Sequence, residues 1–339
     1  MIEFGGATLE NITVIVPIYN MEKRLSLCIQ SLLNQKTYRK FTYVIMLIDD
    51  GSTDASGEIC DSFKKKYSSK IIVFHEKNSG VSAARNFAIK RVNTKYISFA
   101  DPDDYVSPYY LLHLYETLKK DNADLSVCGF QEIWNNDRPT FSEYIKGYQV
   151  LDTKEAIRKL LYQRGVDFSV WGKLIKSEYF KDNYFPLNKR YEDVPVTFNL
   201  FVKSKKVSFI SNNDYVYWQR NDSMLNSKFN NKKLDIIPIL ENLMEQVNEN
   251  FPELGSAVSC RYFAGMSNVY FQVPNDIEES NTIWSSIAKV RKKVLFDKEA
   301  SFKVRMGALC TYFGPKFFKY IYKKTQKRGK VMQLSSVDG

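Results

Sequence analysis

Residues 12–20 read Ile12-Thr13-Val14-Ile15-Val16-Pro17-Ile18-Tyr19-Asn20, and this stretch decides the fold class of the chain. The β-branched run Ile12–Val16 predicts a buried strand, because such side chains pack well on a pleated surface. A helical pattern of apolar residues follows almost at once, over Glu22–Leu33. A strand that leads directly into a helix is the first half of a βαβ unit.

The same alternation continues to residue 128 and predicts a mostly parallel sheet flanked by helices, as in a Rossmann-like α/β fold. Residues 130–225 are mixed, with an aromatic strand at Tyr215–Trp218, and a purely helical pattern begins with Leu234–Val247. The other predicted strands are Tyr43–Ile48, Ile71–Phe74, Tyr96–Phe99 and Leu125–Cys128, and the other predicted helices are Ser56–Tyr67, Val81–Arg91 and Tyr109–Lys119.

Length and composition fit two folded domains. At 339 residues, 44% hydrophobic and 26% charged, the chain can bury a large core, which excludes a disordered chain and a disulfide-stapled miniprotein. We predict an α/β domain at 1–225, a basic helical C-terminal domain at 226–330 and a disordered tail at 331–339.

Cysteine usage and hydropathy predict the compartment. The five cysteines are an odd number without a CxxC pair, and the first residues show no secretory leader pattern. We therefore expect a reduced, cytoplasmic protein. No uninterrupted apolar stretch reaches the roughly 18 residues of a membrane-spanning helix, so we expect no spanning segment.

Charge is concentrated near the C-terminus. The net charge of the chain is +11, but residues 286–330 hold fourteen Lys and Arg against two acids, a local net of +12. This excess predicts an anionic partner, either nucleic acid or phospholipid. Nucleic acid has no supporting motif here, so we expect none to bind.

A helical pattern at 313–327 is compatible with the anionic surface of a membrane; if it binds there, we expect a peripheral protein at the inner face of the cell membrane. Phe313, Phe317, Tyr320 and Ile321 fall on one side of it, and lysines fall on the other. A basic helix with an aromatic face can lie in a membrane interface. The alternative, equally open from the sequence, is that the aromatic side chains pack on their own domain. The lysines in question are Lys316, Lys319, Lys323 and Lys327.

Acidic residues follow the second strand, and in parallel sheets ligands bind outside the carboxyl ends of the strands. The loop reads Asp49-Asp50-Gly51-Ser52-Thr53-Asp54. The chain has neither a GxGxxG nor a GxxxxGK[ST] motif, so no dinucleotide or P-loop site is supported. Capping of the next helix would explain Thr53 or Asp54, but two further carboxylates exceed what capping needs.

A second acidic loop, Asp101-Pro102-Asp103-Asp104, follows the fourth strand. Three carboxylates within four residues repel one another unless a cation or a donor group neutralises them. In an extended backbone Asp101 and Asp103 face the same side, where oxygen ligands would suit a divalent cation. The alternative is a solvated turn before the next helix, with Pro108 as its first residue.

Taken together, the motifs resemble the family-2 glycosyltransferases of the GT-A fold, of the inverting bacterial surface-polysaccharide type. The resemblance runs from about residue 11 to about residue 225. The matching motifs are Ile12–Glu22, the Cys28–Gln35 helix, Asp49–Asp54, Asn78–Asn86, Asp101–Asp104, Trp171–Leu174, Tyr191–Asp193 and Tyr217–Ser223, in the order of the family.

The resemblance implies a UDP-sugar donor and a role for each matched residue. Pro17 and Tyr19 would line the nucleotide pocket, with Glu22 nearby. Asp50 would accept the uracil N3 proton, and Arg85 would help to hold the base.

The resemblance also implies a metal and an acceptor side. Asp101 would reach the ribose, and Asp103 would bind Mn²⁺ or Mg²⁺ that bridges the donor diphosphate. Such a metal offsets the charge that builds on the departing nucleoside diphosphate. Neither histidine matches a metal-binding position of the family, so we expect water and diphosphate to complete the metal shell.

The acceptor or diphosphate side would be lined by Trp171, Lys173, Glu192 and Arg220, although the tryptophan could equally belong to the core and the arginine to the solvent.

Asp193 is the residue we predict to be the general base. A helical pattern that ends near Phe201 places it at a helix N-terminus, where the helix dipole favours an ionised carboxylate. By itself this position suggests a plain helix cap, but in the family the Glu-Asp pair faces the acceptor.

These residues predict a metal-dependent hexosyl- or N-acetylhexosaminyltransferase. The acceptor implied by the resemblance is a capsule or exopolysaccharide unit on a lipid carrier. Alternatives are a transferase acting on teichoic acid or on a surface protein, and an inactive sugar-nucleotide-binding scaffold at the membrane.

Overall fold

The computed structural model describes residues 11–133, 139–219, 229–274 and 278–324. The chain divides into two compact units, Met1–Asn226 and Ser227–Gly339, which we describe separately. The predicted disordered tail at 331–339 lies outside the described residues.

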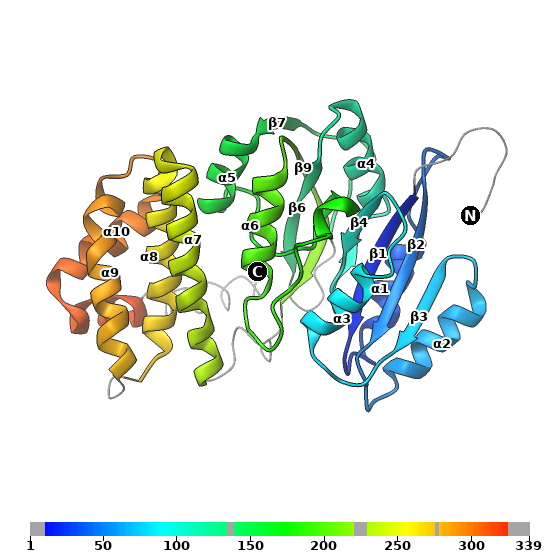
Figure 1. Cartoon of the computed structure of the whole chain (residues 1–339), viewed down its shortest axis with the longest axis horizontal. Helices are drawn as coiled ribbons and strands as arrows, with labels where there is room; N and C mark the ends of the chain where they lie inside the picture. The colour runs from blue at the N-terminus through cyan, green and yellow to red at the C-terminus, as the bar shows by residue number, and fades with distance from the viewer. Residues whose placement is uncertain (1–10, 134–138, 220–228, 275–277, 325–339) are drawn as a thin grey trace, which may run out of the picture. The chain divides into compact units, whose positions relative to one another are not determined.

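The strands described in the N-terminal unit form one nine-stranded sheet (Figure 1). Its order is β3-β2-β1-β4-β8-β6-β9-β5, and β7 pairs with β9. The strands are β1 (Asn11–Ile18), β2 (Thr42–Asp49), β3 (Ile71–His75), β4 (Tyr96–Phe99), β5 (Tyr105–Val106), β6 (Leu125–Ile133), β7 (Tyr148–Asp152), β8 (Lys173–Lys176) and β9 (Lys206–Trp218).

The sheet is parallel in one half and mixed in the other. β1 pairs in parallel with β2 and β4, and β2 pairs in parallel with β3. β8 is antiparallel to both β4 and β6, and β9 is parallel to β6 but antiparallel to β5 and β7. The α/β class is therefore confirmed, but the prediction of a mostly parallel sheet holds only for β3-β2-β1-β4.

The helices of this unit follow the predicted pattern with small shifts at their starts. α1 begins at Leu25 rather than Glu22, and α4 begins at Tyr110, after Pro108 rather than with it. The backbone N–H of Glu22 is instead bound by Asp54, in the loop after β2. The helices are α1 (Leu25–Leu33), α2 (Ser56–Lys66), α3 (Val81–Ile89), α4 (Tyr110–Lys120), α5 (Thr153–Leu161) and α6 (Asp193–Lys203).

Both faces of the sheet are covered by helices. Ile12, Val14 and Val16 of β1 are fully buried in a core that they share with residues of α1 and α4. In Figure 1, α3 and α6 lie in front of the sheet. Burial on both faces explains why β1 reads as a continuous apolar run rather than an alternating one.

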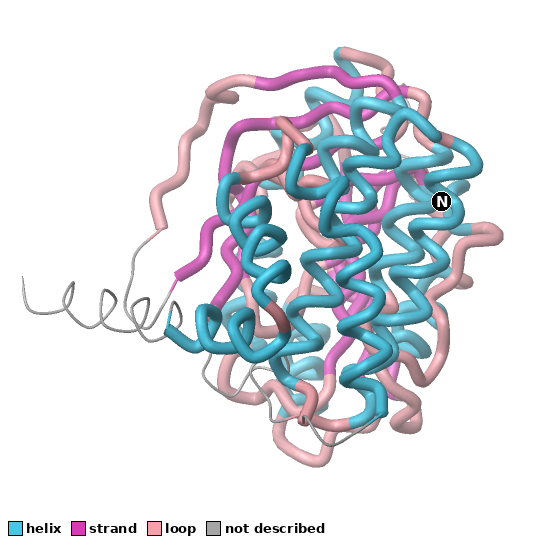
Figure 2. The backbone as a smooth tube through the Cα atoms, turned by 90° about the vertical axis from the view of Figure 1, so that its left-hand side faces the viewer, coloured by secondary structure: helices cyan, strands magenta, loops and turns pink. Residues whose placement is uncertain are grey.

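The C-terminal unit is helical, as predicted. Its helices are α7 (Ile236–Asn250), α8 (Gly255–Gln272), α9 (Glu278–Phe296) and α10 (Phe302–Cys310), and residues 315–324 are also helical. Figure 2, in which this unit faces the viewer, shows its longer helices running alongside one another. None of the helices within the described ranges is long and apolar enough to cross a membrane.

Candidate active site

The loops after β1 and β2 are joined side by side. β1 and β2 stay in register to their ends, where Ile18 pairs with Asp49. The Asn20 Oδ1 accepts a hydrogen bond from the Thr53 N–H (2.8 Å), and the Glu22 Oε2 accepts one from the Ala55 N–H (3.2 Å). Glu22, predicted near the nucleotide, therefore helps to fasten one loop to the other.

An exposed aromatic ring lies beside this junction. Tyr19 directly follows β1, and its side chain is 46% exposed although the strand before it is buried. Tyr19 and Pro17 therefore stand at the carboxyl end of the sheet, the edge where the nucleotide pocket is predicted.

The two carboxylates that end β2 point to different partners. Asp49 accepts a hydrogen bond from the Ser52 N–H (3.0 Å) and contacts His75 Nδ1 (2.8 Å). Burial acts to raise the pKa of Asp49, but the bonds from Ser52 and His75 outweigh it, and the pKa is lowered. Neither Asp49 nor Asp50 caps α2, so the helix-capping explanation does not account for this pair.

Asp50 organises the loop after β3. Its two carboxylate oxygens accept hydrogen bonds from the backbone N–H groups of Ser79 and Gly80, each at 2.8 Å. Gly51 permits the close approach of the two loops, because a Cβ atom there would lie 2.7 Å from the Asn78 nitrogen and the φ angle is +70°. A carboxylate oxygen has two lone pairs, so the predicted hydrogen bond from the N3–H of uracil to Asp50 is chemically compatible with these two backbone bonds.

Arg85 of α3 lies at the centre of the site and is buried. Its Nη1 donates to Glu192 Oε1 (2.7 Å) and its Nη2 donates to Asp101 Oδ1 (3.2 Å). Burial acts to lower the pKa of Arg85, but the charges of Asp101, Glu192 and Asp193 raise it. The guanidinium thus joins one acidic loop to the Glu-Asp pair, two motifs that are far apart in the sequence.

The third nitrogen of the Arg85 guanidinium differs from the other two. Its Nε is buried and has no hydrogen-bond partner among the residues that the structure describes. A buried donor without a partner is costly, and no group within the described ranges offsets this cost at the Arg85 Nε. The predicted contact of Arg85 with the base remains a prediction.

The acidic loop after β4 is a turn rather than an extended segment. The Asp104 N–H donates to the Asp101 carbonyl oxygen (3.2 Å), which closes a four-residue turn. The argument that Asp101 and Asp103 share one side of an extended chain was therefore wrong in its premise. Both side chains are nevertheless partly exposed, whereas Pro102 and Asp104 are buried.

Asp104 is a structural residue that sequence reasoning missed. Its carboxylate accepts hydrogen bonds from the Tyr215 hydroxyl (2.9 Å) and the Trp218 N–H (2.9 Å). The same hydroxyl of Tyr215 accepts a bond from the Asp101 N–H (3.0 Å), so β9 holds the turn at both ends. Burial, together with the charges of Asp103 and Asp101, raises the pKa of Asp104.

The residues of this turn fit a divalent cation only if other ligands complete its shell. Asp103 is partly exposed beside Asp101 and Asp104, and the mutual repulsion of these carboxylates would be relieved by a positive charge. No three His, Cys, Asp or Glu side chains within the described ranges are grouped to hold a metal by themselves. A metal here would therefore need oxygen ligands from water or from a substrate diphosphate.

Asp193 is the first residue of α6, as predicted. The helix is capped by Glu192, whose side chain makes no capping bond in the described part of the chain and instead accepts from Arg85. The side chain of Asp193 is only partly exposed. Burial, followed by the charge of Glu192, raises the pKa of Asp193 to about 7, although the charge of Arg85 opposes this. A carboxylate with this pKa can take up and release a proton near neutral pH.

Asn86 fixes the loop that leads to this pair. Its side-chain Nδ2 donates to the Phe185 carbonyl oxygen and its Oδ1 accepts from the Phe185 N–H, both at 2.8 Å. Tyr191, directly before Glu192, has a φ angle of +59°, a conformation that is unfavourable for an aromatic residue. Asn86 occurs in a motif of the sequence, but nothing in the pattern identified its partner 99 positions away.

Two of the residues predicted on the acceptor side are buried. Trp171 stacks on Tyr215, with ring centroids 4.3 Å apart, and the core-packing alternative describes its contacts well. The Lys173 Nζ donates to the carbonyl oxygens of Ser169 (2.6 Å) and Trp171 (3.3 Å). Burial lowers the pKa of Lys173. Arg220 lies outside the described residues.

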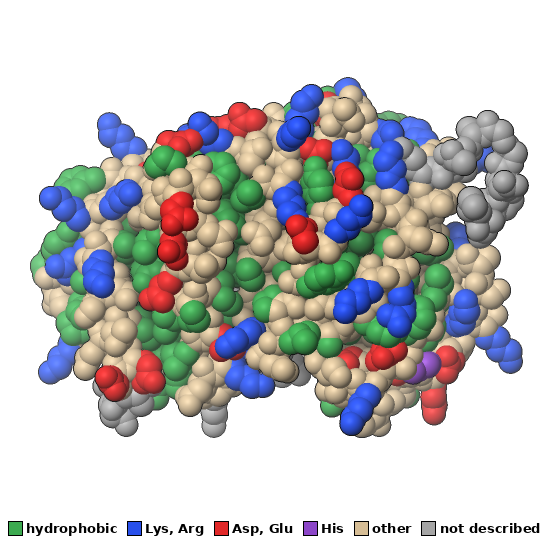
Figure 3. Space-filling model, viewed as in Figure 1, with side chains coloured by type: hydrophobic (Ala, Val, Ile, Leu, Met, Phe, Trp, Pro, Cys, Tyr) green, Lys and Arg blue, Asp and Glu red, His purple; other side chains and the backbone are tan. Residues whose placement is uncertain are grey.

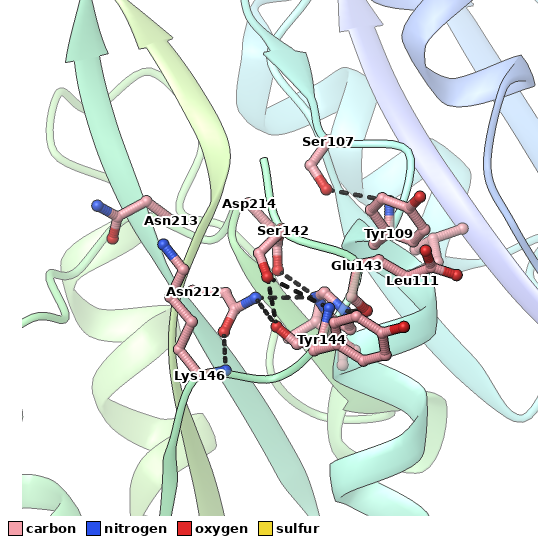
Figure 4. A network of polar contacts seen from close by, with 12 residues as sticks. Ser107, Tyr109, Leu111, Ser142, Glu143, Tyr144, Lys146, Asn212, Asn213 and Asp214 are labelled. Carbon is pink, nitrogen blue, oxygen red and sulfur yellow. Dashed lines mark hydrogen bonds and ion pairs between the residues drawn. The ribbon is translucent and has the colours of Figure 1, made fainter. Parts of the chain in front are cut away.

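A buried polar network supports the sheet away from these loops (Figure 4). The His113 Nδ1 contacts Asp214 Oδ2 and its Nε2 contacts the Glu143 carbonyl oxygen, both at 2.8 Å. Burial acts to lower the pKa of His113, but these two bonds outweigh it and raise the pKa. The Asn212 side chain accepts from the Lys146 N–H and donates to the Tyr144 carbonyl oxygen, so the network secures segment 142–146 to β9.

Comparison with known proteins assigns the family. The model of "Glycosyl transferase family 2" matches residues 13–183, about half of the chain, which include the loops after β1, β2 and β4 and helix α3 but end before Glu192 and Asp193. The chain therefore belongs to glycosyltransferase family 2, and its N-terminal unit has the GT-A fold.

Two curated relatives and one solved structure illustrate the similarity. Glycosyltransferase GlyA of Streptococcus pneumoniae is 34% identical over 63% of this chain and 31% of its own length. The poly(ribitol-phosphate) beta-glucosyltransferase of Bacillus spizizenii is 34% identical over 62% of this chain and 32% of its own length. The match thus spans about a third of each of these relatives.

The solved structure extends the similarity to both units. The crystal structure of S. aureus TarS 1–349 in complex with UDP-GlcNAc has a TM-score of 0.65 and covers 94% of this chain and 92% of its own chain. At 18% identity it shows the shared fold alone.

Proposed function

We propose that this chain is an inverting glycosyltransferase that moves a sugar from a UDP-sugar to a hydroxyl group of a surface-glycan acceptor, with Asp193 as the general base. The observation that carries the proposal is the position and pKa of this carboxylate. With a pKa raised to about 7, Asp193 can accept the proton of an acceptor hydroxyl at neutral pH and is anchored beside the Arg85 centre.

The residues around Asp193 have separate proposed roles. Arg85 and Glu192 hold the base-bearing loop at a fixed distance from the acidic turn. The acceptor oxygen, freed of its proton by Asp193, would attack the anomeric carbon from the face opposite the diphosphate, which inverts the configuration. Oriented attack of this kind supplies a large part of the rate enhancement.

The proposed donor site is formed by five residues, each with the role predicted for it from the sequence: Pro17, Tyr19, Asp50, Asp101 and Asp103. TarS has been solved with UDP-GlcNAc and with UDP, which supports a uridine donor for this fold. A bound Mn²⁺ or Mg²⁺ at Asp103 would stabilise the negative charge of the leaving diphosphate. The sugar would be a hexose or an N-acetylhexosamine.

The proposed acceptor is a capsule or exopolysaccharide unit on a lipid carrier, which would place the reaction at the inner face of the cell membrane. A second acceptor is favoured by one specific finding. A relative at 34% identity is named as a poly(ribitol-phosphate) beta-glucosyltransferase, so a teichoic-acid polymer is the alternative that we would test beside it. A surface protein is a further alternative acceptor, but no comparison favours it.

The test is a titration of UDP with and without Mn²⁺, followed by turnover of a panel of UDP- and GDP-sugars. We expect UDP to bind more tightly with the metal, and Asp103→Asn to remove this gain, a loss of at least about tenfold in affinity. Unchanged metal-dependent binding in Asp103→Asn would remove the metal assignment.

The same assay tests whether the protein is an enzyme. Hydrolysis or transfer of one sugar nucleotide by wild type supports catalysis. If the folded protein binds UDP but turns over no sugar nucleotide with either acceptor class, the inactive scaffold becomes the better reading.

A further inference from the structure

The C-terminal unit exposes six aromatic side chains within a single stretch, residues 296–320. Soluble surfaces carry single apolar residues, but large exposed apolar groups close together mark an interaction site. We call these six side chains the aromatic surface. They are Phe296 (71% exposed), Phe302 (75%), Tyr312 (47%), Phe313 (67%), Phe317 (38%) and Tyr320 (56%).

Packing within the described part of the unit leaves these rings largely exposed, although the Arg291 guanidinium lies over the Tyr312 ring at 4.1 Å. In the helix at 315–324 the packing is made by Phe318 and Tyr322, which contact Phe271 at centroid distances of 4.8 and 3.6 Å. Phe313 and Phe317 instead contact each other, at 5.1 Å. The helix and the residues just before it therefore pack on their own unit through one set of aromatic residues and leave a second set exposed, among them Phe313, Phe317 and Tyr320.

The neighbouring helix α10 shows the same excess of apolar surface. Of its nine residues Ala308 alone is buried, although the helix also carries Phe302, Met306 and Leu309. Leu309 is 39% exposed. A helix in this position has apolar side chains on faces that its own fold does not cover.

The charges around the aromatic surface are almost all positive. Residues 286–330 carry a net charge of +12, and Figure 3 shows basic side chains beside hydrophobic ones over α9 and α10. Of the two acids in this stretch, Asp297 and Glu299, the carboxylate of Asp297 is engaged within the unit, since it accepts hydrogen bonds from the Cys260 thiol (3.2 Å) and the Glu299 N–H (2.9 Å). The surface therefore combines exposed aromatic rings with a positive field.

We propose that the aromatic surface inserts into the interface of a membrane rich in anionic phospholipid. Rings of Phe and Tyr suit the boundary between headgroups and acyl chains, and the surrounding lysines attract anionic headgroups. A second copy of the chain is disfavoured as the occupant, because it would bring another +12 against the first. The inference goes beyond the proposed function, since it concerns the C-terminal unit and holds for any donor.

The experiment is sedimentation of the full chain with vesicles, using equal parts phosphatidylglycerol and phosphatidylcholine or phosphatidylcholine alone. Wild type should bind the anionic vesicles and lose binding at about 0.5 M salt, where the screening length falls to roughly 4 Å. The double variant Phe313→Ser/Phe317→Ser should bind at least about tenfold more weakly, because two rings no longer leave water.

The matched control is Tyr144→Ser, which removes an aromatic ring that is 79% exposed in the N-terminal unit. It should bind vesicles as wild type does. Retained UDP affinity and an unchanged melting temperature in the double variant show that the protein is folded, so that loss of vesicle binding is distinguishable from failure of the donor site.

Three results would overturn the proposal: wild type that binds neither vesicle, wild type that binds both equally, and a double variant that binds as well as wild type. A wild-type dimer that Phe313→Ser/Phe317→Ser converts to a monomer in sedimentation velocity would also overturn it, in favour of a second copy as the occupant.

Discussion

At the scale of single residues, the proposed chemistry depends on the protonation state of Asp193. Its pKa of about 7 means that the deprotonated base is a minor species in mild acid. Transfer should therefore increase about tenfold per pH unit below 7 and level off above it. The measurement is the initial rate of sugar transfer as a function of pH at saturating donor.

Asp193→Asn should abolish this pH limb and lower the transfer rate by about 100-fold or more, while UDP affinity stays unchanged. A variant that keeps near-wild-type turnover would show that another group is the base.

Stability gives a second, independent readout of the same carboxylate. The pKa of Asp193 is raised by folding from 3.8 to about 7, so its charge destabilises the folded state above pH 7 and has no such effect below about pH 4. Asp193→Asn should accordingly raise the melting temperature at pH 8 but not at pH 4. A rise of equal size at both pH values would contradict the raised pKa.

The residues that could be predicted from the sequence are those whose role follows from their place in a motif. Asp193 at the start of a helix is such a case. Asp104 and Asn86 are not, because their hydrogen-bond partners are 111 and 99 positions away and only the fold brings them together. The turn at Asp101–Asp104 was misjudged for the same reason, since its shape is held by Tyr215 from a distant strand.

At the scale of the element, the side chain of Asn86 links α3 to the loop before α6. Asn86→Ala should lower transfer by about tenfold and destabilise the protein by about 1–3 kcal/mol, because two hydrogen bonds are lost. UDP affinity should not change. Asn86→Asp, which keeps the bond from the Phe185 N–H but turns a carboxylate oxygen toward the Phe185 carbonyl oxygen, should lose at least as much as alanine in both readouts. Equal UDP and transfer losses in Asn86→Ala would indicate general misfolding instead.

The helix at 315–324 offers a matched pair of neighbouring phenylalanines. Phe318 is 5% exposed and Phe317 is 38% exposed. Phe318→Ala should cost about 3–5 kcal/mol of unfolding free energy, because it leaves a cavity among Tyr270, Phe271 and Trp284. Phe317→Ala should cost less than about 1 kcal/mol. Denaturant unfolding measures both, and similar losses would mean that the helix faces the other way.

Helices α1, α2, α3, α4 and α7 were predicted to within a few residues because each shows an apolar period over several turns, whereas α5 and α10 were not predicted. The mixed half of the sheet was not, because β8 and β5 have only four and two residues and pair with strands that are distant in sequence. A short strand carries too little pattern to show its direction.

At the scale of the whole molecule, every described residue of the proposed donor site lies in the N-terminal unit. Saturation with UDP and Mn²⁺ at about 100 times the dissociation constant should add about 2.7 kcal/mol of apparent stability, a rise of roughly 5–10 °C in melting temperature. GDP should give a smaller shift. Phe318→Ala should lower the starting melting temperature but leave the UDP-dependent shift intact, and loss of the shift would show that the donor site depends on the C-terminal unit.

Helix α3 has a consequence for how the site can evolve. Gly80, Arg85 and Asn86 follow one another along this single rod, and they contact Asp50, the Asp101–Glu192 pair and Phe185 respectively. One residue inserted after Gly80 would turn Arg85 and Asn86 about 100° around the helix axis and pull both from their partners together. The length of α3 therefore fixes the spacing between the proposed nucleotide site and the proposed base, and it can change only if the three distant loops that it contacts change as well.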